Sequence, residues 1–248
     1  MIEHDRAHHY TPLIWAARNG HEGVVKILLK PENVNPNLAD RDARTPLVWA
    51  AGEGHEGVVK ILLERENIDP DRPDKDRVRP LGWAAIYGHE GVAQLLLERG
   101  DVDPNCPDRK AQTPLANAAI NGHEGVVKLL LEREDVDPNR PNVNDKTPLG
   151  CAALGGHEGV VKLLLGREDV DINHPDDDGY VPLGCAAFAG HKGVVKLLLE
   201  RDNVDVNRPG MCDRTPLGLA AFEGHEGVVV EIFRSLCIFH NTTVYSFT

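Results

Sequence analysis

The stretch Thr11–Leu29, TPLIWAARNGHEGVVKILL, decides the fold because it returns along the chain at a fixed spacing. Its opening triplet, Thr-Pro-Leu with the variants Arg-Pro-Leu and Val-Pro-Leu, recurs every 34 residues, and so does a Gly-His pair whose histidine lies ten residues after each triplet begins. A constant period of this length is the signature of a repeat array, in which each repeat packs only on its neighbours. The repeats begin at Thr11, Thr45, Arg79, Thr113, Thr147, Val181 and Thr215.

Local signals predict two short helices and a loop in each repeat. The Thr11 hydroxyl can cap a first helix while Pro12 takes its first position, and Gly20 suits its end. A second helix follows from His21, with Glu22 and Lys26 spaced as a solvent-facing i,i+4 pair, a pattern that repeats in most copies. The capping threonine is missing at Arg79 and Val181, which predicts that repeats three and six are less stable, each by about 1 kcal/mol.

These residues carry a family resemblance. The motif TPLIWAARNGHEGVVKILL and its six relatives resemble the ankyrin repeat over residues 11 to about 233. The period alone also fits the tetratricopeptide repeat, but the Thr-Pro-Leu cap, the paired alanines Ala16 and Ala17, and the Gly-His pair are the ankyrin signature. The resemblance implies an all-α solenoid of stacked helix-turn-helix repeats with a concave binding face.

The pattern divides the chain into three parts. Residues 1–10 form an N-terminal leader, residues 11–233 the repeat domain, and residues 234–248 a divergent C-terminal tail. The sequence leaves the pattern abruptly after Val229. Two interpretations stay open: a truncated or altered longer array, or a last helix with an irregular tail that covers repeat seven.

Charge and hydropathy exclude several classes of partner. Lys and Arg number 27 against 39 Asp and Glu, a net charge of -12, so we expect no nucleic-acid binding. No apolar run approaches the roughly 20 residues that a membrane span needs, so we expect no membrane insertion. The polar start, MIEHDRAHHY, does not resemble a secretory signal, which predicts a cytoplasmic or nuclear protein that is not secreted and whose five cysteines are thiols.

The residues that could suggest catalysis fit structural roles better. Seven of the 12 histidines fall at one position of the repeat, and His21-Glu22 does not begin a zinc-binding HExxH helix because Val25 stands at the fifth position. In the acidic run from His174 to Gly179, the first and last positions of a calcium loop would be His174 and Cys185, which are not carboxylates. We therefore expect no catalytic residue, no metal site and no cofactor.

The resemblance also assigns candidate partner-binding residues. In the ankyrin family the first helices act as a palm and the turns between repeats as fingers. Each repeat has two palm positions, and the first of the two is apolar from repeat three onward in this chain. We expect a partner segment with apolar contacts along this stripe and an acidic stretch near Arg109; the alternative is that the stripe packs against its own neighbours. The same two interpretations, packing or binding strip, stay open for Trp15, Trp49 and Trp83, which share one first-helix position. The candidate residues are Ile86, Tyr87, Ile120, Leu154, Phe188 and Phe222 on the palm, and Arg44, Arg109, Lys110 and Tyr180 in the turns.

The sequence therefore favours a monomeric, non-catalytic scaffold that binds a partner protein through the concave face of an ankyrin array. Two other functions stay open. The array could target or regulate a larger multidomain protein such as an enzyme, or it could be an adaptor between membrane proteins and an internal skeleton.

Overall fold

The described part of the chain is entirely helical. The computed structural model describes residues 10–31 and 34–239, which contain fourteen α-helices, one short 3-10 helix and no strand. The predicted all-α fold is confirmed. Most of the predicted leader and the last nine residues of the predicted tail lie outside the described residues.

Each repeat contributes a first helix and a second helix. The first helices are α1 (Pro12–Arg18), α3 (Pro46–Gly52), α5 (Pro80–Tyr87), α7 (Pro114–Asn121), α9 (Pro148–Gly155), α11 (Pro182–Ala189) and α13 (Pro216–Phe222). The second helices are α2 (Glu22–Leu29), α4 (Glu56–Leu63), α6 (Glu90–Leu97), α8 (Glu124–Leu131), α10 (Glu158–Leu165), α12 (Lys192–Leu199) and α14 (Glu226–Phe239). The 3-10 helix η1 (Met211–Asp213) lies in the turn before α13.

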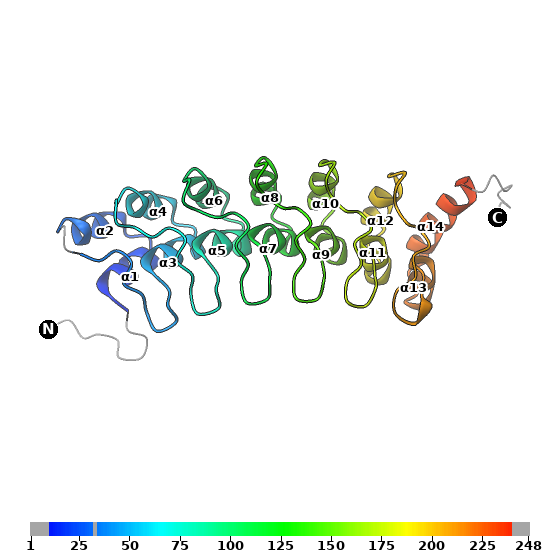
Figure 1. Ribbon diagram of the computed structural model, residues 1–248, viewed down its shortest axis with the longest axis horizontal. Coiled ribbons are helices and arrows are strands. Elements are labelled where there is room, and N and C mark those ends of the chain that lie inside the picture. Colours follow the sequence, from blue (N-terminus) through cyan, green and yellow to red (C-terminus); the bar gives the residue numbers. More distant parts are fainter. Residues whose placement is uncertain (1–9, 32–33, 240–248) are drawn as a thin grey trace. The chain divides into compact units, whose positions relative to one another are not determined.

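The chain forms two compact units, residues 1–136 and 137–248, which we call the N-terminal and C-terminal units. Within each unit, first helices pack on first helices and second helices on second helices. The turns between repeats project from the row of first helices, on the side away from the second helices (Figure 1). The core lies between the two rows, where buried Leu, Val and Ala side chains recur in each repeat.

Threonine hydroxyls begin most of the first helices, as the sequence predicts. The Oγ1 atom of Thr45 accepts a hydrogen bond from the backbone N–H of Val48 at 3.2 Å, and Thr113 and Thr147 cap their helices in the same way. Arg79 and Val181 make no such bond, although their backbones have the same extended conformation. The predicted loss of these two caps is confirmed.

The predicted Glu–Lys pairs are wrong. Among the described residues, no ion pair within 4.0 Å joins Glu22 to Lys26 or makes the equivalent pairing in later repeats. The Glu22 carboxylate instead lies against Gly57, in the first turn of the next second helix. The partial positive charge of a helix N-terminus attracts a carboxylate, and a glycine there leaves room for it. The same contact joins Glu56 to Gly91, Glu90 to Gly125, and Glu158 to Gly193.

A histidine hydrogen bond joins successive repeats. The Nε2 atom of His89 lies 2.9 Å from the carbonyl oxygen of Gly52, and because a carbonyl only accepts, the ring N–H donates. The same ring lies on Gly54, where an added Cβ atom would come within 2.6 Å of Nδ1 and where φ is +76°. Only glycine suits both the left-handed backbone and this close approach. Equivalent bonds run from His55 to Arg18, His123 to Ile86, His191 to Leu154, and His225 to Phe188.

Five of the six turns between repeats are each held by one acidic or amide side chain, and in the sixth Gly210 stands at that position. The Oδ1 atom of Asp74 accepts from the backbone N–H groups of Asp76 and Val78, both at 2.9 Å. Neighbouring turns are also joined through their backbones, since Lys75 N–H donates to the carbonyl oxygen of Asp42 at 2.9 Å. Asp40, Asp108, Asn142 and Asp176 hold their own turns as Asp74 does.

Restoring the missing cap in repeat six should stabilise the protein. Val181 is 1% exposed, and its φ and ψ of -73° and 165° equal those of the capping Thr147. We expect Val181→Thr to raise the free energy of unfolding, measured with urea, by about 1 kcal/mol, and Thr147→Val to lower it by a similar amount. An unchanged stability in Thr147→Val, or a loss of stability in Val181→Thr, would contradict a stabilising cap at this position.

Candidate binding surface

Two neighbouring depressions lie on the first helices and turns of the N-terminal unit. The first has a volume of about 460 Å³ and the second about 430 Å³. Trp83 lines both, so one indole separates them. The first is lined by Arg44, Val48, Trp49, Gly52, Glu53, Trp83, Tyr87 and His89.

An arginine between two tryptophans forms the wall of the first depression. The Cζ atom of Arg44 lies 4.9 Å from the centre of the Trp49 ring and 4.6 Å from that of Trp83, both within cation–π range. A hydrogen bond to a turn carboxylate orients each indole. Trp49 Nε1–H donates to Asp40 at 2.9 Å, and Trp83 Nε1–H donates to Asp74 at 3.1 Å. The turn carboxylates that shape the backbone therefore also orient the aromatic wall.

The open side of this depression is formed by Tyr87. Its ring stacks on Trp83 with centroids 5.8 Å apart and an interplanar angle of 13°, yet 55% of the residue stays exposed. On the Trp49 side, the Arg18 guanidinium lies 4.5 Å from the Trp49 ring and 3.7 Å from the Glu53 carboxylate. An amphipathic ring is thus held rigidly at the surface, where it can contact another molecule.

The second depression combines apolar and basic side chains. Ile86 and Ile120 are half-buried in it, while Arg109 and Lys110 are exposed at its rim. The Arg109 guanidinium is 4.0 Å from Asp76 of the preceding turn, a loose and solvent-screened pair.

The C-terminal unit presents a separate set of apolar side chains. Leu154, Phe188 and Phe222 are 38%, 46% and 66% exposed, at equivalent positions of successive first helices. The Phe222 ring is covered in part by Arg214, whose Cζ atom lies 4.0 Å from the ring centre. The Tyr180 ring lies against Gly210 of the next turn and is half-buried.

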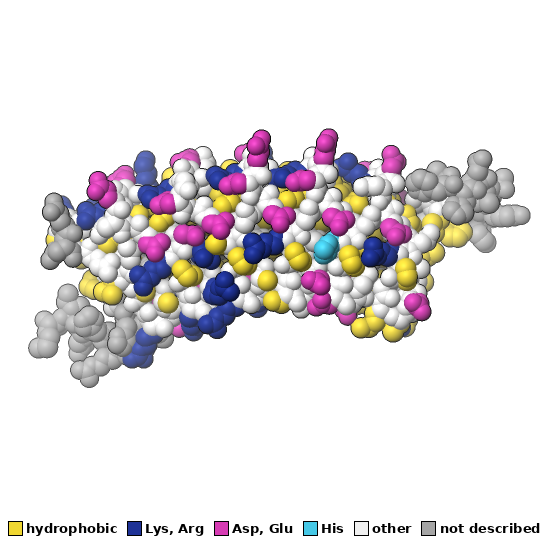
Figure 2. All heavy atoms as spheres, viewed as in Figure 1, with side chains coloured by type: hydrophobic (Ala, Val, Ile, Leu, Met, Phe, Trp, Pro, Cys, Tyr) yellow, Lys and Arg dark blue, Asp and Glu magenta, His cyan; other side chains and the backbone are white. Residues whose placement is uncertain are grey.

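The turns of the two units differ in charge. In the N-terminal unit they expose Arg41, Lys75, Arg109 and Lys110, and Figure 2 shows Lys and Arg side chains gathered along the lower edge over these turns. In the C-terminal unit the turns expose Asp145, Asp177 and Asp178. The basic turns are a local exception in a chain of net charge -12.

Comparison with known proteins identifies the family. The family model described as "Ankyrin repeats (3 copies)" matches residues 13–108, 81–176 and 160–242, which together span most of the chain. The chain belongs to the ankyrin repeat family. It is similar to a solved structure, the crystal structure of the human ASB11 ankyrin repeat domain, with 25% sequence identity and a TM-score of 0.77; the match covers 90% of this chain and 98% of that one. A search of curated proteins returned no match.

Ankyrin repeats are generally protein-interaction modules, and the ankyrin fold is typically non-catalytic. Among residues 10–31 and 34–239, no group of three or more His, Cys, Asp or Glu side chains could hold a metal ion. Burial raises the pKa of the Cys151 thiol to about 11 and that of Cys185 to about 12, so both stay protonated near neutral pH. No helix in the described part is long and apolar enough to cross a membrane.

The ankyrin array places the candidate residues in two groups. Ile86, Tyr87, Ile120, Arg109 and Lys110 lie around the adjoining depressions, and Arg44 lies inside the first one rather than at its rim. Leu154, Phe188, Phe222 and Tyr180 belong to the C-terminal unit. The candidate residues did not include Glu53, and the role of Trp49 and Trp83 stayed open. The available signal was that tryptophan stands at the same first-helix position in each of the first three repeats.

One half-buried charged pair lies apart from this surface. Arg79, which replaces a capping threonine, donates from Nε to Asp71 Oδ2 at 3.0 Å. Asp71 Oδ1 and Arg79 Nη1 are buried and have no hydrogen-bond partner among the described residues. Burial raises the pKa of Asp71 to about 6, and the nearby Arg79 opposes that rise only in part.

This raised pKa predicts a pH-dependent difference between wild type and Asp71→Asn. A carboxyl whose pKa is higher in the folded state contributes stability below its unfolded value of 3.8 and loses that contribution as the pH rises to about 6. The variant cannot ionise, so its free energy of unfolding relative to wild type should increase between pH 4 and pH 7 by about 1 kcal/mol, discounted for solvent screening. Urea unfolding at both pH values tests this, and a constant difference would contradict it.

Proposed function

We propose that this ankyrin array is a non-catalytic scaffold that binds an extended segment of a partner protein along its first helices and turns. The observation that carries the proposal is the pair of adjoining depressions that share Trp83. Such a surface suits a segment whose apolar side chains enter the depressions and whose acidic side chains face the turns. The five free thiols are consistent with a protein located in a reducing compartment, the cytoplasm or nucleus.

The proposed apolar contacts involve first-helix side chains that are not buried between repeats. Tyr87 is 55% exposed and its ring contacts Trp83 and His89, whereas Leu81 and the alanines of the same helix are 0–1% exposed. Aromatic side chains fixed in one orientation lose little conformational entropy on binding, and they often dominate interface energies. Tyr87 is therefore the expected anchor.

The acidic part rests on the charge of the turns. Arg109 and Lys110 stand beside the second depression, and Lys75 stands one turn earlier. Lys75 Nζ is held at 2.6 Å from Asp42, but Arg109 is only loosely paired and can turn toward a partner carboxylate. In the C-terminal unit, considered by itself, Leu154, Phe188 and Phe222 are further exposed apolar side chains that a partner can contact.

A peptide-display selection tests the proposal directly. A library of peptides cut from natural proteins is selected on the full chain, and the dissociation constant of the best peptide is measured for wild type and variants. We expect acidic peptides with an aromatic or branched apolar residue, at least tenfold weaker binding by Tyr87→Ser, and weaker binding at high salt.

The matched control is Ile27→Ser. Ile27 is 63% exposed but lies on a second helix, away from the proposed surface, so its removal should leave peptide binding unchanged. Circular dichroism should show the same helicity in both variants as in wild type. Peptides that bind Tyr87→Ser and an Arg109→Glu, Lys110→Glu variant as tightly as wild type would exclude this surface.

A further inference from the structure

The first repeat exposes a face that is buried in later repeats. Val24 of α2 is 46% exposed, whereas its equivalents Val58, Val92, Val126, Val160 and Val194 are at most 1% exposed. Leu28 and Pro12 are also more exposed than their equivalents, which the preceding repeat covers. We call this surface, formed by α1 and α2, the N-terminal end face.

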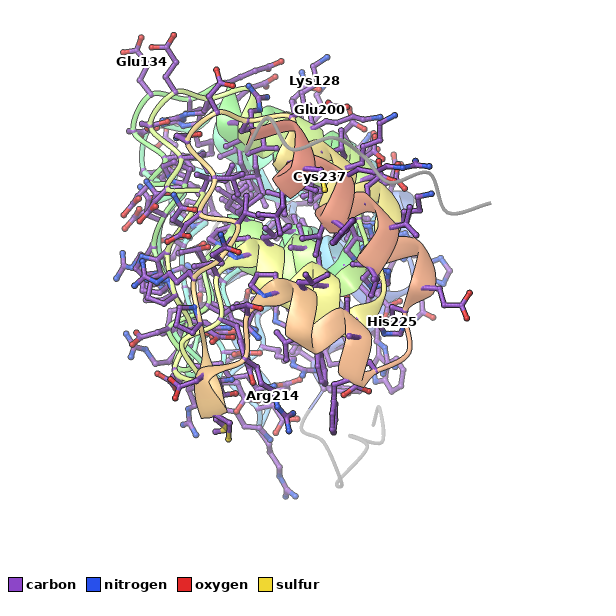
Figure 3. The ribbon with its side chains drawn as sticks, turned by 90° about the vertical axis from the view of Figure 1, so that its right-hand side faces the viewer. Lys128, Glu134, Glu200, Arg214, His225 and Cys237 are labelled. Carbon is purple, nitrogen blue, oxygen red and sulfur yellow. The ribbon has the colours of Figure 1, made fainter. Side chains whose placement is uncertain are left out.

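The last repeat exposes the opposite face. Ala221 of α13 is exposed, whereas its equivalents Ala187 and Ala153 are 0% exposed. Leu217 and Val229 are half-buried, although the same positions one repeat earlier are completely buried. Figure 3 looks onto this surface, formed by α13 and α14, which we call the C-terminal end face.

The histidine contact that joins repeats has its donor side on one end face and its acceptor side on the other. His21 is exposed, and no hydrogen bond from its ring is found among the described residues, unlike its five equivalents that donate to the preceding repeat. At the other end, Gly224 has the same left-handed φ, +78°, as the glycines that receive a histidine ring, but no described atom lies within 4 Å of a Cβ atom added there.

The carboxylate contact between second helices is divided in the same way. Gly23 is the equivalent of Gly57, which receives Glu22, yet no described atom lies within 4 Å of a Cβ atom added at Gly23. Glu226, the equivalent of Glu22, is exposed at the start of α14. The apolar positions, the histidine bond and the carboxylate contact are therefore each split between the two end faces.

We propose that the C-terminal end face of one copy stacks on the N-terminal end face of a second copy, reproducing the junction between interior repeats. In this contact His21 donates to the carbonyl oxygen of Phe222 and its ring lies on Gly224, while Glu226 lies against Gly23. The occupant is a copy of this chain because its own interior junctions show which surface covers each of these positions. The proposal departs from the monomer that the sequence predicts.

Two physical consequences distinguish this contact from partner binding. It joins different surfaces of the two copies, so association continues into longer stacks instead of stopping at a dimer. Each copy carries a net charge of -12, so copies repel each other at low salt and associate more strongly as salt rises. The proposed peptide binding has the opposite salt dependence.

Sedimentation velocity over a wide range of protein concentration tests the proposal, at high salt, with the full chain. We expect the weight-average sedimentation coefficient of wild type to rise steadily with concentration. Val24→Glu places a charge on the N-terminal end face, and Ala221→Glu places one on the C-terminal end face. Each variant alone should therefore be monomeric. An equimolar mixture should form a 1:1 dimer and nothing larger, because one intact face of each kind remains.

Other outcomes would overturn the proposal. A wild type that stays monomeric shows that something else covers the end faces, and a Val24→Glu variant that still associates shows a contact between like faces. Both substituted positions are exposed, and circular dichroism checks that both variants fold. Tyr87→Ser is the matched control: it should lose peptide binding and keep self-association, while the end-face variants should do the reverse.

Discussion

The hydrogen bond from a histidine ring to a carbonyl of the preceding repeat is the constraint on which the structure depends. It fixes the distance between repeats, and it needs a glycine in the left-handed conformation directly beneath the ring. Because the bond recurs at 2.9–3.0 Å in each junction where it is described, every repeat must keep the same length and register. The constant spacing of the sequence follows from this geometry.

Features that arise within one repeat could be predicted from the sequence. The threonine caps and their loss at Arg79 and Val181 needed only local rules. The structural role of the histidines followed from their recurrence at one position of the repeat, but their hydrogen-bond partners did not. Features that depend on the next repeat could not. Glu22 lies against the neighbouring helix instead of pairing with Lys26, and Arg44 lies between indoles from two repeats, because both side chains respond to groups 34 or more residues away. The non-glycine residues with positive φ in the turns, Ala43 and Ala111 among them, were also not predictable from propensity.

The candidate surface occupies positions that the stack leaves unconstrained. Histidines, glycines, turn carboxylates and buried leucines repeat because each junction needs them, whereas the outer positions of the first helices and the tips of the turns vary. Variation there places Tyr87 beside Trp83 and basic side chains beside Ile120. The same logic applies at the ends of the array, where groups that satisfy a neighbour inside the stack are presented to solvent or to another copy.

The free energy of unfolding of His89→Ala, compared with that of His21→Ala by urea unfolding at low protein concentration, tests the central claim most directly. The two substitutions are chemically identical at equivalent positions, but only His89 donates to a preceding repeat in the described structure. We predict a loss of about 1–3 kcal/mol for His89→Ala, which leaves the Gly52 carbonyl without its donor, and a loss of less than about 0.5 kcal/mol for His21→Ala. Equal losses in the two variants would contradict the claim that this bond holds the repeats together.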